Sequence, residues 1–497
     1  MTTMPADDAL AAPRVSLGER LSDRCNPIFV REIQQAVGSR MFAVTVGAGL
    51  TAVVLLAFSS AAARGGGLRN GRDFFIMGLI LLTPILSFVI PLQAFMSMRR
   101  EVAGGTAEQL LLTELTPAGI VRGKLAAAML QFFLHLGIFA PVLALAFLLR
   151  GIDVATIALM LVLACLSCLV ATTVAIALGS LSRFRVVQNF NLAIAGTLLG
   201  GYTVGTMAGM WDLVRGLQRA VAGREFAWLA SVLIVCGALA VVLFAMIAAS
   251  TLTHPYENRS TKFRVFPFLA YAATVALVLS CPWLDRDGWL VLLSLPIFAA
   301  VPIWLFAVTE VDALSPRVRT LVPRGRLRAF LAVPFLPGGP RGMVHTVLFY
   351  GIATGSSLLL MLLFASHWPS ERDVFMMLMA GAYLLLYALI VFGVRRFLPQ
   401  TARGTWLARL GGPALIALLV LLPTMIDVFA RDRLGGWHVG HILNAPWTIR
   451  EFRHEASLGL CLVLGMDAVL LLFFVRPLRA AFREVRVASG IRRDAAR

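Results

Sequence analysis

Twelve long apolar segments constrain the fold of this chain more than any other feature of its sequence. Their approximate residue ranges are 41–63, 74–97, 125–149, 154–181, 190–210, 226–250, 265–281, 289–308, 343–365, 374–394, 409–430 and 458–475. Most approach the ~20 residues that a helix needs to cross about 30 Å of hydrocarbon. The seventh and eighth fit least well, since one is short and the other contains Pro296 and Pro302. Because 59% of all residues are hydrophobic, more than a soluble core can bury, we expect an all-α polytopic membrane protein with about 12 transmembrane helices.

The basic residues are distributed unevenly between the two predicted sides of the membrane. With the N-terminus inside, 31 of the 44 Lys and Arg residues fall in cytoplasmic segments and 13 in outer loops. This excess follows the positive-inside rule, so both termini are expected in the cytosol. Basic segments facing anionic headgroups account for the net charge of +18. Nucleic-acid binding is not expected, because no basic stretch carries interleaved aromatic residues for stacking.

The apolar segments divide the chain into two membrane regions. Residues 1–25 are expected to be a disordered cytoplasmic tail, with no apolar core of a signal peptide visible. Residues 26–250 hold the first six spans, and 251–264 form a cytoplasmic linker. Residues 265–475 hold the second six spans, whose role the sequence does not indicate, and 476–497 form a basic cytoplasmic tail.

Residues 98–124 form the one long polar stretch between spans in the first half of the chain. Gly104 and Gly105 interrupt any helix that leaves the membrane, and Thr106 then offers an N-cap oxygen, with Gln109 completing a capping box. Thr116 followed by Pro117 is a second helix start. We therefore expect one short isolated helix near 107–114. Its apolar residues are Leu110, Leu111 and Leu115, and its carboxylates are Glu101, Glu108 and Glu114.

Pattern alone leaves two readings of this short helix. It is either a docking element for a cytosolic partner or an amphipathic helix resting on the lipid surface. A second amphipathic helix is expected from Pro27 onward in the stretch NPIFVREIQQAVGSR, residues 26–40.

These two stretches resemble the permease subunits of ATP-binding-cassette (ABC) transporters of the type-2 export class. In that family the loop between the second and third spans reads approximately E-x-x-x-G-T-x-E-x-L-L-x-T-P-L-S, followed by a Gly-Lys pair. The matching residues here are Glu101, Gly105, Thr106, Glu108, Leu110, Leu111, Thr113, Gly123 and Lys124. The opening resembles the family's Asn-Pro-x-x-x-(Arg/Lys)-Glu start through Asn26, Pro27, Arg31 and Glu32. One departure is Glu114, which stands where the family usually has proline.

The resemblance implies a function and a set of partners. Residues 107–114 would be the coupling helix on which a separate ABC ATPase docks, and the helix from Pro27 would be the family's elbow helix. ATP and Mg would be bound by that ATPase, so no cofactor is expected in this chain. The permease would work as a homodimer or with a sister permease in the bacterial inner (cytoplasmic) membrane. Export is the direction that the family resemblance implies.

The sequence itself contains no sign of an enzyme. No G-x-x-x-x-G-K-(S/T) loop occurs, and no hydrolytic motif is present. No metal site is expected: Cys165 and Cys168 have C-x-x-C spacing but lie in an apolar span, where helix packing is the favoured reading. The outer loop 431–457 carries His438 and His441, which are too few for a metal site and belong to a substrate lid or, as we favour, a capped surface loop.

Two features inside the spans are candidates for helix packing or for a transport pathway. Gly201, Gly205 and Gly209 recur every fourth residue, which puts a smooth stripe on one helix face. This stripe suits a subunit or pathway interface and packing within the subunit equally well. Asp467 lies midway along the last span, where a carboxylate is costly without a partner or an aqueous cavity. A structural hydrogen bond is the favoured role, and contact with substrate or protons is the alternative.

Two other functions agree with the same spans. An ion-gradient-driven secondary transporter with twelve spans suits the 6 + 6 arrangement, but the halves share no visible sequence similarity and the spans lack charge for coupling ions. A non-transporting membrane scaffold for a cytosolic ATPase would share the docking helix without substrate-dependent ATP turnover.

Overall fold

The computed structural model describes residues 26–62, 71–112, 115–181, 184–221, 223, 226–254, 257–281, 286–364, 370–431, 439–451 and 456–494. Within these ranges the chain is helical and has no β-strand. Ten helices are long and apolar enough to cross a membrane, or up to twelve when two bent helix pairs are each one span. The prediction of an all-α, multi-pass membrane protein is therefore confirmed. The predicted disordered tail, residues 1–25, lies outside the described residues.

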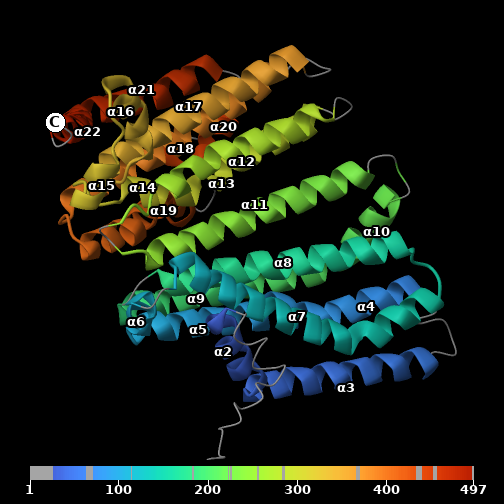
Figure 1. Ribbon diagram of the computed structural model, residues 1–497. Helices are drawn as coiled ribbons and strands as arrows, with labels where there is room; N and C mark the ends of the chain where they lie inside the picture. The colour runs from blue at the N-terminus through green and yellow to red at the C-terminus, as the bar shows by residue number, and fades with distance from the viewer. Residues whose placement is uncertain are drawn as a thin grey trace, which may run out of the picture. The chain divides into compact units, whose positions relative to one another are not determined.

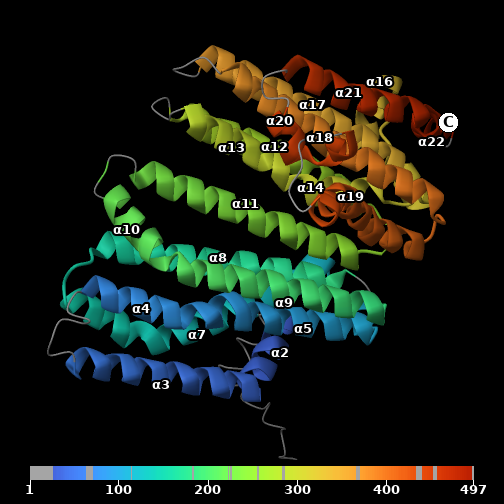
Figure 2. The same ribbon diagram turned by 180° about the vertical axis from the view of Figure 1, so that it is seen from behind.

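The first unit, Met1–Leu252, is one of two compact units in the chain. Its long helices run nearly parallel to one another in both views (Figures 1 and 2). Its elements are α2 (Pro27–Val37), α3 (Arg40–Ala62), α4 (Gly71–Pro84), the π-helix η1 (Ile85–Val89), α5 (Ile90–Ala103), α6 (Thr106–Leu112), α7 (Pro117–Leu148), α8 (Val154–Ser180), α9 (Arg185–Ala208), α10 (Met210–Val221) and α11 (Phe226–Leu252).

The second span of this unit is continuous from α4 through η1 to α5. Pro84 and Pro91 flank the π-helix, and each lacks the N–H that an α-helical turn would use. The Ile90 N–H donates to the Ile85 carbonyl across the wider turn. Within the π-helix, the Ser87 hydroxyl lies 2.7 Å from the Thr203 hydroxyl of α9. The wide turn thus places a hydroxyl contact between the second and fifth spans.

The second unit, Thr253–Arg497, is also all-helical in its described part. Its elements are α12 (Thr261–Leu279), α13 (Arg286–Ala299), α14 (Val301–Val308), α15 (Pro316–Leu321), α16 (Arg326–Ala332), the 3₁₀-helix η2 (Val333–Phe335), α17 (Gly339–Phe364), α18 (Glu371–Phe397), α19 (Ala402–Arg431), η3 (Val439–Leu443), α20 (Ala445–Glu451), α21 (Ala456–Phe473) and α22 (Val475–Asp494). Helix α12 begins inside the range predicted as a linker, and the predicted basic tail is the helix α22.

The two units repeat one arrangement of spans, although their sequences show no visible similarity. In each, the fourth span packs against the second, third, fifth and sixth, and the first three spans pack against one another. Short helices separate the second and third spans in both units: α6 in the first, and α15 and α16 in the second. Short helices also follow the fifth span in both, namely α10 in the first unit and η3 with α20 in the second. The second half of the chain is therefore a second copy of the architecture of the first.

Close backbone contact holds the second and third spans of the second unit together. A Cβ atom at Gly342 of α17 would lie 2.2 Å from the Ala307 carbonyl oxygen of α14, so only glycine fits there. The atoms that this Cβ would meet are backbone atoms of Ala307 and Val308, which cannot rotate away as a side chain can.

We expect Gly342→Ala to destabilise the protein by about 1–3 kcal/mol through overpacking. The matched control is Gly351→Ala on the same helix, where no described atom lies within 4 Å of the added methyl group. Thermal unfolding in detergent measures both variants. Equal stability of the two would contradict the close approach.

Candidate functional site

Helix α2, which was predicted as an elbow helix, is fixed to the start of the third span by its N-cap residue. The Asn26 side chain accepts a hydrogen bond from the Ile28 N–H, 3.0 Å away, and so caps the helix, while Pro27 takes the first helical position. The same amide donates to the Gly119 carbonyl of α7 at 2.7 Å. At Gly123 an added Cβ would lie 2.8 Å from the Ile28 Cβ, so a glycine lets α2 lie directly against α7.

The predicted short helix between the second and third spans exists as α6. Helix α5 ends at Ala103, and Gly105 adopts a φ of +72°, which turns the chain before α6 begins at Thr106. The Thr106 hydroxyl donates to the Glu101 carbonyl at 3.2 Å and ties the start of α6 to the end of α5. Thr116 caps α7 by accepting from the Gly119 N–H, as predicted.

Helix α6 has an exposed apolar end. Leu112 is 88% exposed, whereas Leu110 is half-buried. Predicted coupling residues Thr113 and Glu114 lie outside the described residues, as do the side chains of Glu108 and Leu111.

Four predicted residues from the two separate motifs meet in one ion cluster near the end of α5, which leads into α6. These are Arg31 and Glu32 of α2, Glu101 of α5 and Lys124 of α7. The Lys124 Nζ lies 2.6 Å from Glu32 Oε1 and 3.1 Å from Glu101 Oε1. Arg31 contacts both carboxylates. The cluster therefore joins the elbow helix, the second span and the third span.

Ser97 of α5 completes the cluster and was missed by the sequence analysis. Its hydroxyl lies 2.8 Å from both Glu32 carboxylate oxygens and 2.6 Å from the Lys124 Nζ. No family motif or spacing marks this serine. Its position four residues before Glu101, one helical turn away, is the only signal that it shares a face with the acid.

Burial makes this cluster energetically important. The Lys124 side chain is 1% exposed, and those of Glu32 and Glu101 are 12% and 9% exposed. Burial alone would raise the pKa of Glu32, but the ammonium group of Lys124, the Ser97 hydroxyl and Arg31 hold the pKa below its ordinary value of 4.5. Glu32 is therefore charged at neutral pH and pairs with the cations beside it.

A cavity of about 260 Å³ opens beside the cluster. Glu32, Ser97 and Lys124 line one side, and the amides of Gln35, Gln93 and Gln131 line others. The rest of the lining is mostly apolar and includes Ile90, Leu92 and Met96. The ion cluster forms one wall of the cavity.

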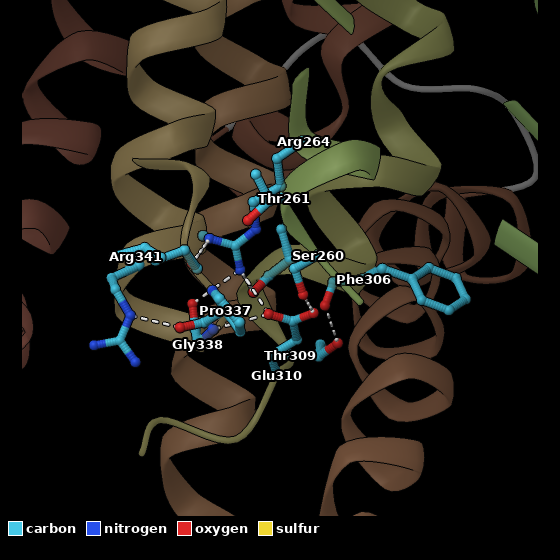
Figure 3. A network of polar contacts seen from close by, with 12 residues as sticks. Ser260, Thr261, Arg264, Phe306, Thr309, Glu310, Pro337, Gly338 and Arg341 are labelled. Carbon is cyan, nitrogen blue, oxygen red and sulfur yellow. Dashed lines mark hydrogen bonds and ion pairs between the residues drawn. The ribbon is translucent and has the colours of Figure 1, made fainter. Parts of the chain in front are cut away.

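A second polar cluster occupies the corresponding place in the second unit (Figure 3). Arg264, at the start of the first span, donates to Glu310 Oε2 at 2.7 Å and is fully buried. Ser260 and the Gly338 N–H also donate to this carboxylate, which follows the end of the second span. Burial would raise the pKa of Glu310, but Arg264 and these hydrogen bonds lower it.

Arg341 extends this second cluster to the third span and to α22. It donates to Glu484 Oε2 of α22 at 3.0 Å and to the Asp312 carbonyl. In both units, an acid at the end of the second span and a base at the start of the third thus belong to a buried polar cluster. This second cluster was not predicted, because its residues are scattered along the chain and match no motif.

The remaining predicted site residues lie apart from these clusters. Gly201, Gly205 and Gly209 are exposed on α9, and no described atom outside α9 lies within 4 Å of an added Cβ at any of them. Asp467 of α21 is 3% exposed, and neither carboxylate oxygen has a hydrogen-bond partner within the described residues. The structural hydrogen bond that was the favoured role of Asp467 is therefore not found among the described residues.

The outer loop of the second unit is folded around His441. Its Nε2 atom lies 2.8 Å from Asp427 Oδ2, and its ring stacks on Trp447 with centroids 4.4 Å apart. His438 lies outside the described residues. Across the described ranges, no group of three or more His, Cys, Asp or Glu side chains could hold a metal ion.

No family model, curated protein or solved structure matched the chain. Its function is therefore inferred from its residues and their geometry.

We expect Lys124→Met to lower the free energy of unfolding by about 3–5 kcal/mol, because it leaves two buried carboxylates with Arg31 as their only cation. The chain has one other lysine, Lys262, which is exposed and serves as the matched control. Lys262→Met should stay within about 0.5 kcal/mol of wild type. Thermal or denaturant unfolding in detergent compares the two; similar losses would show that the cluster is not a stabilising contact.

The lowered pKa of Glu32 predicts acid sensitivity with a definite sign. A depressed folded-state pKa stabilises the protein above the unfolded value of 4.5, and that stability is lost as the pH falls through the folded-state value. Wild type should therefore lose more stability than Glu32→Gln between about pH 5 and pH 3. Unfolding midpoints across this range measure it, and parallel curves for the two proteins would contradict the assignment.

Proposed function

We propose that this chain is the transmembrane permease subunit of an ATP-driven exporter of the ABC type-2 class. A separate ABC ATPase would dock on α6, between the second and third spans. The observation that carries the proposal is the ion cluster of Arg31, Glu32, Glu101 and Lys124. It joins the two sequence stretches that resemble this family, and its Glu101 is tied to the start of the short helix through the Thr106 hydroxyl.

The geometry suits the transmission of a mechanical stroke. The Thr106 hydroxyl and the turn at Gly105 connect α6 to Glu101, so a displacement of α6 reaches the cluster within one residue contact. Because Lys124 contacts acids from two other helices, α2, α5 and α7 would move together rather than slide apart. Closure of two ATPases would then tilt the attached spans and open a path outward.

The proposal includes the partners and the location. ATP and Mg would be bound by the ATPase subunits, so this chain would need no cofactor of its own and would not be an enzyme. It would act in the bacterial cytoplasmic membrane as a homodimer or with a sister permease. The second unit repeats the six-span arrangement of the first. Within one chain it would therefore take the place of a sister permease.

An ion-gradient-driven transporter is the second candidate function. The repeat of six spans is typical of such proteins, and Asp467 offers a buried carboxylate in the middle of a span without a described partner. The buried ion pairs favour the ATPase-coupled reading, because in both units they lie at the inner ends of spans on the predicted cytoplasmic side. A non-transporting scaffold would bind the ATPase but show no substrate-dependent hydrolysis.

The test uses Leu112→Asp in the full chain, purified with its candidate ATPase in lipid. Leu112 is 88% exposed, so a polar residue there leaves the fold intact and removes an apolar contact from α6. We expect at least tenfold weaker binding of the ATPase and loss of permease-stimulated ATP hydrolysis, as for a central apolar contact worth about 1.4 kcal/mol or more.

The matched control is Phe397→Asp, an equally exposed apolar residue at the predicted cytoplasmic end of α18. It should bind the ATPase as wild type does. Unchanged binding by Leu112→Asp would sink the docking assignment and favour the ion-driven transporter. Retained binding and hydrolysis that no transported compound alters would favour the scaffold.

A further inference from the structure

A groove on the second unit lies between α16 and α22. It has a volume of about 450 Å³, within the ~300–1,000 Å³ range of small-molecule sites. Phe330 of α16 and Phe482 of α22 stack across it, with ring centroids 5.4 Å apart and planes at 29°. Arg326, Arg483 and Arg486 line the same space, with Ser489 at its side. The groove therefore combines a flat apolar floor with three guanidinium groups.

These three arginines have no anionic partner among the described residues. The acid nearest in sequence, Glu484, is occupied elsewhere: it accepts from Arg319 and Arg341 and from the Leu314 N–H. A cluster of unpaired guanidinium groups favours an anion, and the planar fork of Arg binds a phosphate through two parallel hydrogen bonds. The missing negative charge therefore comes from outside the described chain.

An arginine stripe connects the groove to the end of the last span. Arg476, Arg479, Arg483 and Arg486 follow one another at spacings of three and four residues, which puts them on one face of α22, and all four are exposed. The opposite face of α22 packs its Val485 and Ala488 into the apolar cluster with α15 and α16. The stripe thus runs from the membrane end of α22 toward the groove.

The groove begins at the outer edge of the headgroup layer. Helix α22 leaves α21 at a bend of 56°. Residues 482–489 lie about 10–21 Å along α22 from Val475, or about 6–12 Å beyond the end of a span that follows the bilayer normal. The headgroup region extends about 5–7 Å beyond the hydrocarbon on each side. The long side chains of Arg483 and Arg486 would therefore reach back toward the phosphates from just outside that layer.

Helix α16 provides a surface for acyl chains beside the groove. Leu327, Phe330 and Leu331 are 71%, 61% and 60% exposed and lie on one side of the helix. Arg326 and Arg328 flank this apolar stripe. A stripe of this kind, bordered by arginines, is typical of helices that lie in the membrane interface. A soluble phosphate would use the arginines but leave the stripe uncovered.

We propose that the groove between α16 and α22 binds an anionic phospholipid, with its phosphate on Arg326, Arg483 and Arg486 and its acyl chains along Leu327, Phe330 and Leu331. This site is independent of the proposed ATPase contact at α6. It would anchor the cytoplasmic segment between the second and third spans of the second unit to the inner leaflet.

The test measures lipid retention by native mass spectrometry of the full chain, using palmitoyl-oleoyl-phosphatidylglycerol and the matching phosphatidylcholine. Wild type should retain the anionic lipid preferentially. The triple variant Arg326→Gln/Arg483→Gln/Arg486→Gln should lose about fivefold affinity per arginine, or roughly 100-fold in all. The matched control, Arg40→Gln/Arg122→Gln/Arg185→Gln, removes three exposed arginines from the first unit and should keep the preference.

Two further arms separate other ligands from a lipid. Displacement of the bound phosphatidylglycerol by millimolar glycerol phosphate would overturn the proposal in favour of a free phosphate. Retention of the lipid by the groove variant, with loss of ATPase binding instead, would overturn it in favour of a protein-docking surface. Equal lipid loss in the groove variant and the control would show an unspecific charge effect and would also overturn it. The ATPase arm is read separately from Leu112→Asp, so this proposal and the exporter assignment fail independently.

Discussion

Lys124 lies in a site that is almost closed to water, where two carboxylates, Glu32 and Glu101, contact its side-chain nitrogen. Each acid comes from a different helix, so the arrangement of α2, α5 and α7 depends on all three groups being present together. A buried ion pair contributes less to stability than its attraction suggests, since desolvation offsets much of it. Its larger effect is on geometry: removing any one partner strands a charge, and the helices cannot shift without that cost.

The second unit reaches the same result with different chemistry. There the cation is the Arg264 guanidinium, which contacts Glu310 and four backbone carbonyls, whereas Lys124 makes point contacts. A planar fork with five donors suits a site formed by carbonyls of several segments. The two units therefore share the packing of spans and a buried glutamate at the end of the second span, but the cation and its other partners differ. This divergence explains why the repeat is invisible in the sequence.

Local signals in the sequence predicted the elements well. All twelve apolar segments are helices, and the start of α7 at Pro117 followed from Thr116 because capping depends on neighbouring residues only. Four residues of the ion cluster were predicted as site residues in two separate motifs, but the contact between the motifs was not predicted. Its contacts join residues 70 and 92 positions apart, and no periodicity carries that information. The network around Glu310 was missed for the same reason, and the α16–α22 groove depends on a bend after Phe473 that a hydropathy pattern does not show.

The π-helix at Ile85–Val89 changes which side of the second span its inner residues face. Successive residues of an α-helix are about 100° apart, and a π-turn holds one residue more than an α-turn. The inner half of the span, which carries Ser97 and Glu101, is therefore rotated by about 100° relative to an uninterrupted helix continuing from α4. A single inserted residue thus sets which face of the inner half meets α2 and α7. A related sequence without the wide turn would be one residue shorter in this span. The halves before and after the π-helix therefore have to be aligned separately, with a one-residue gap between them.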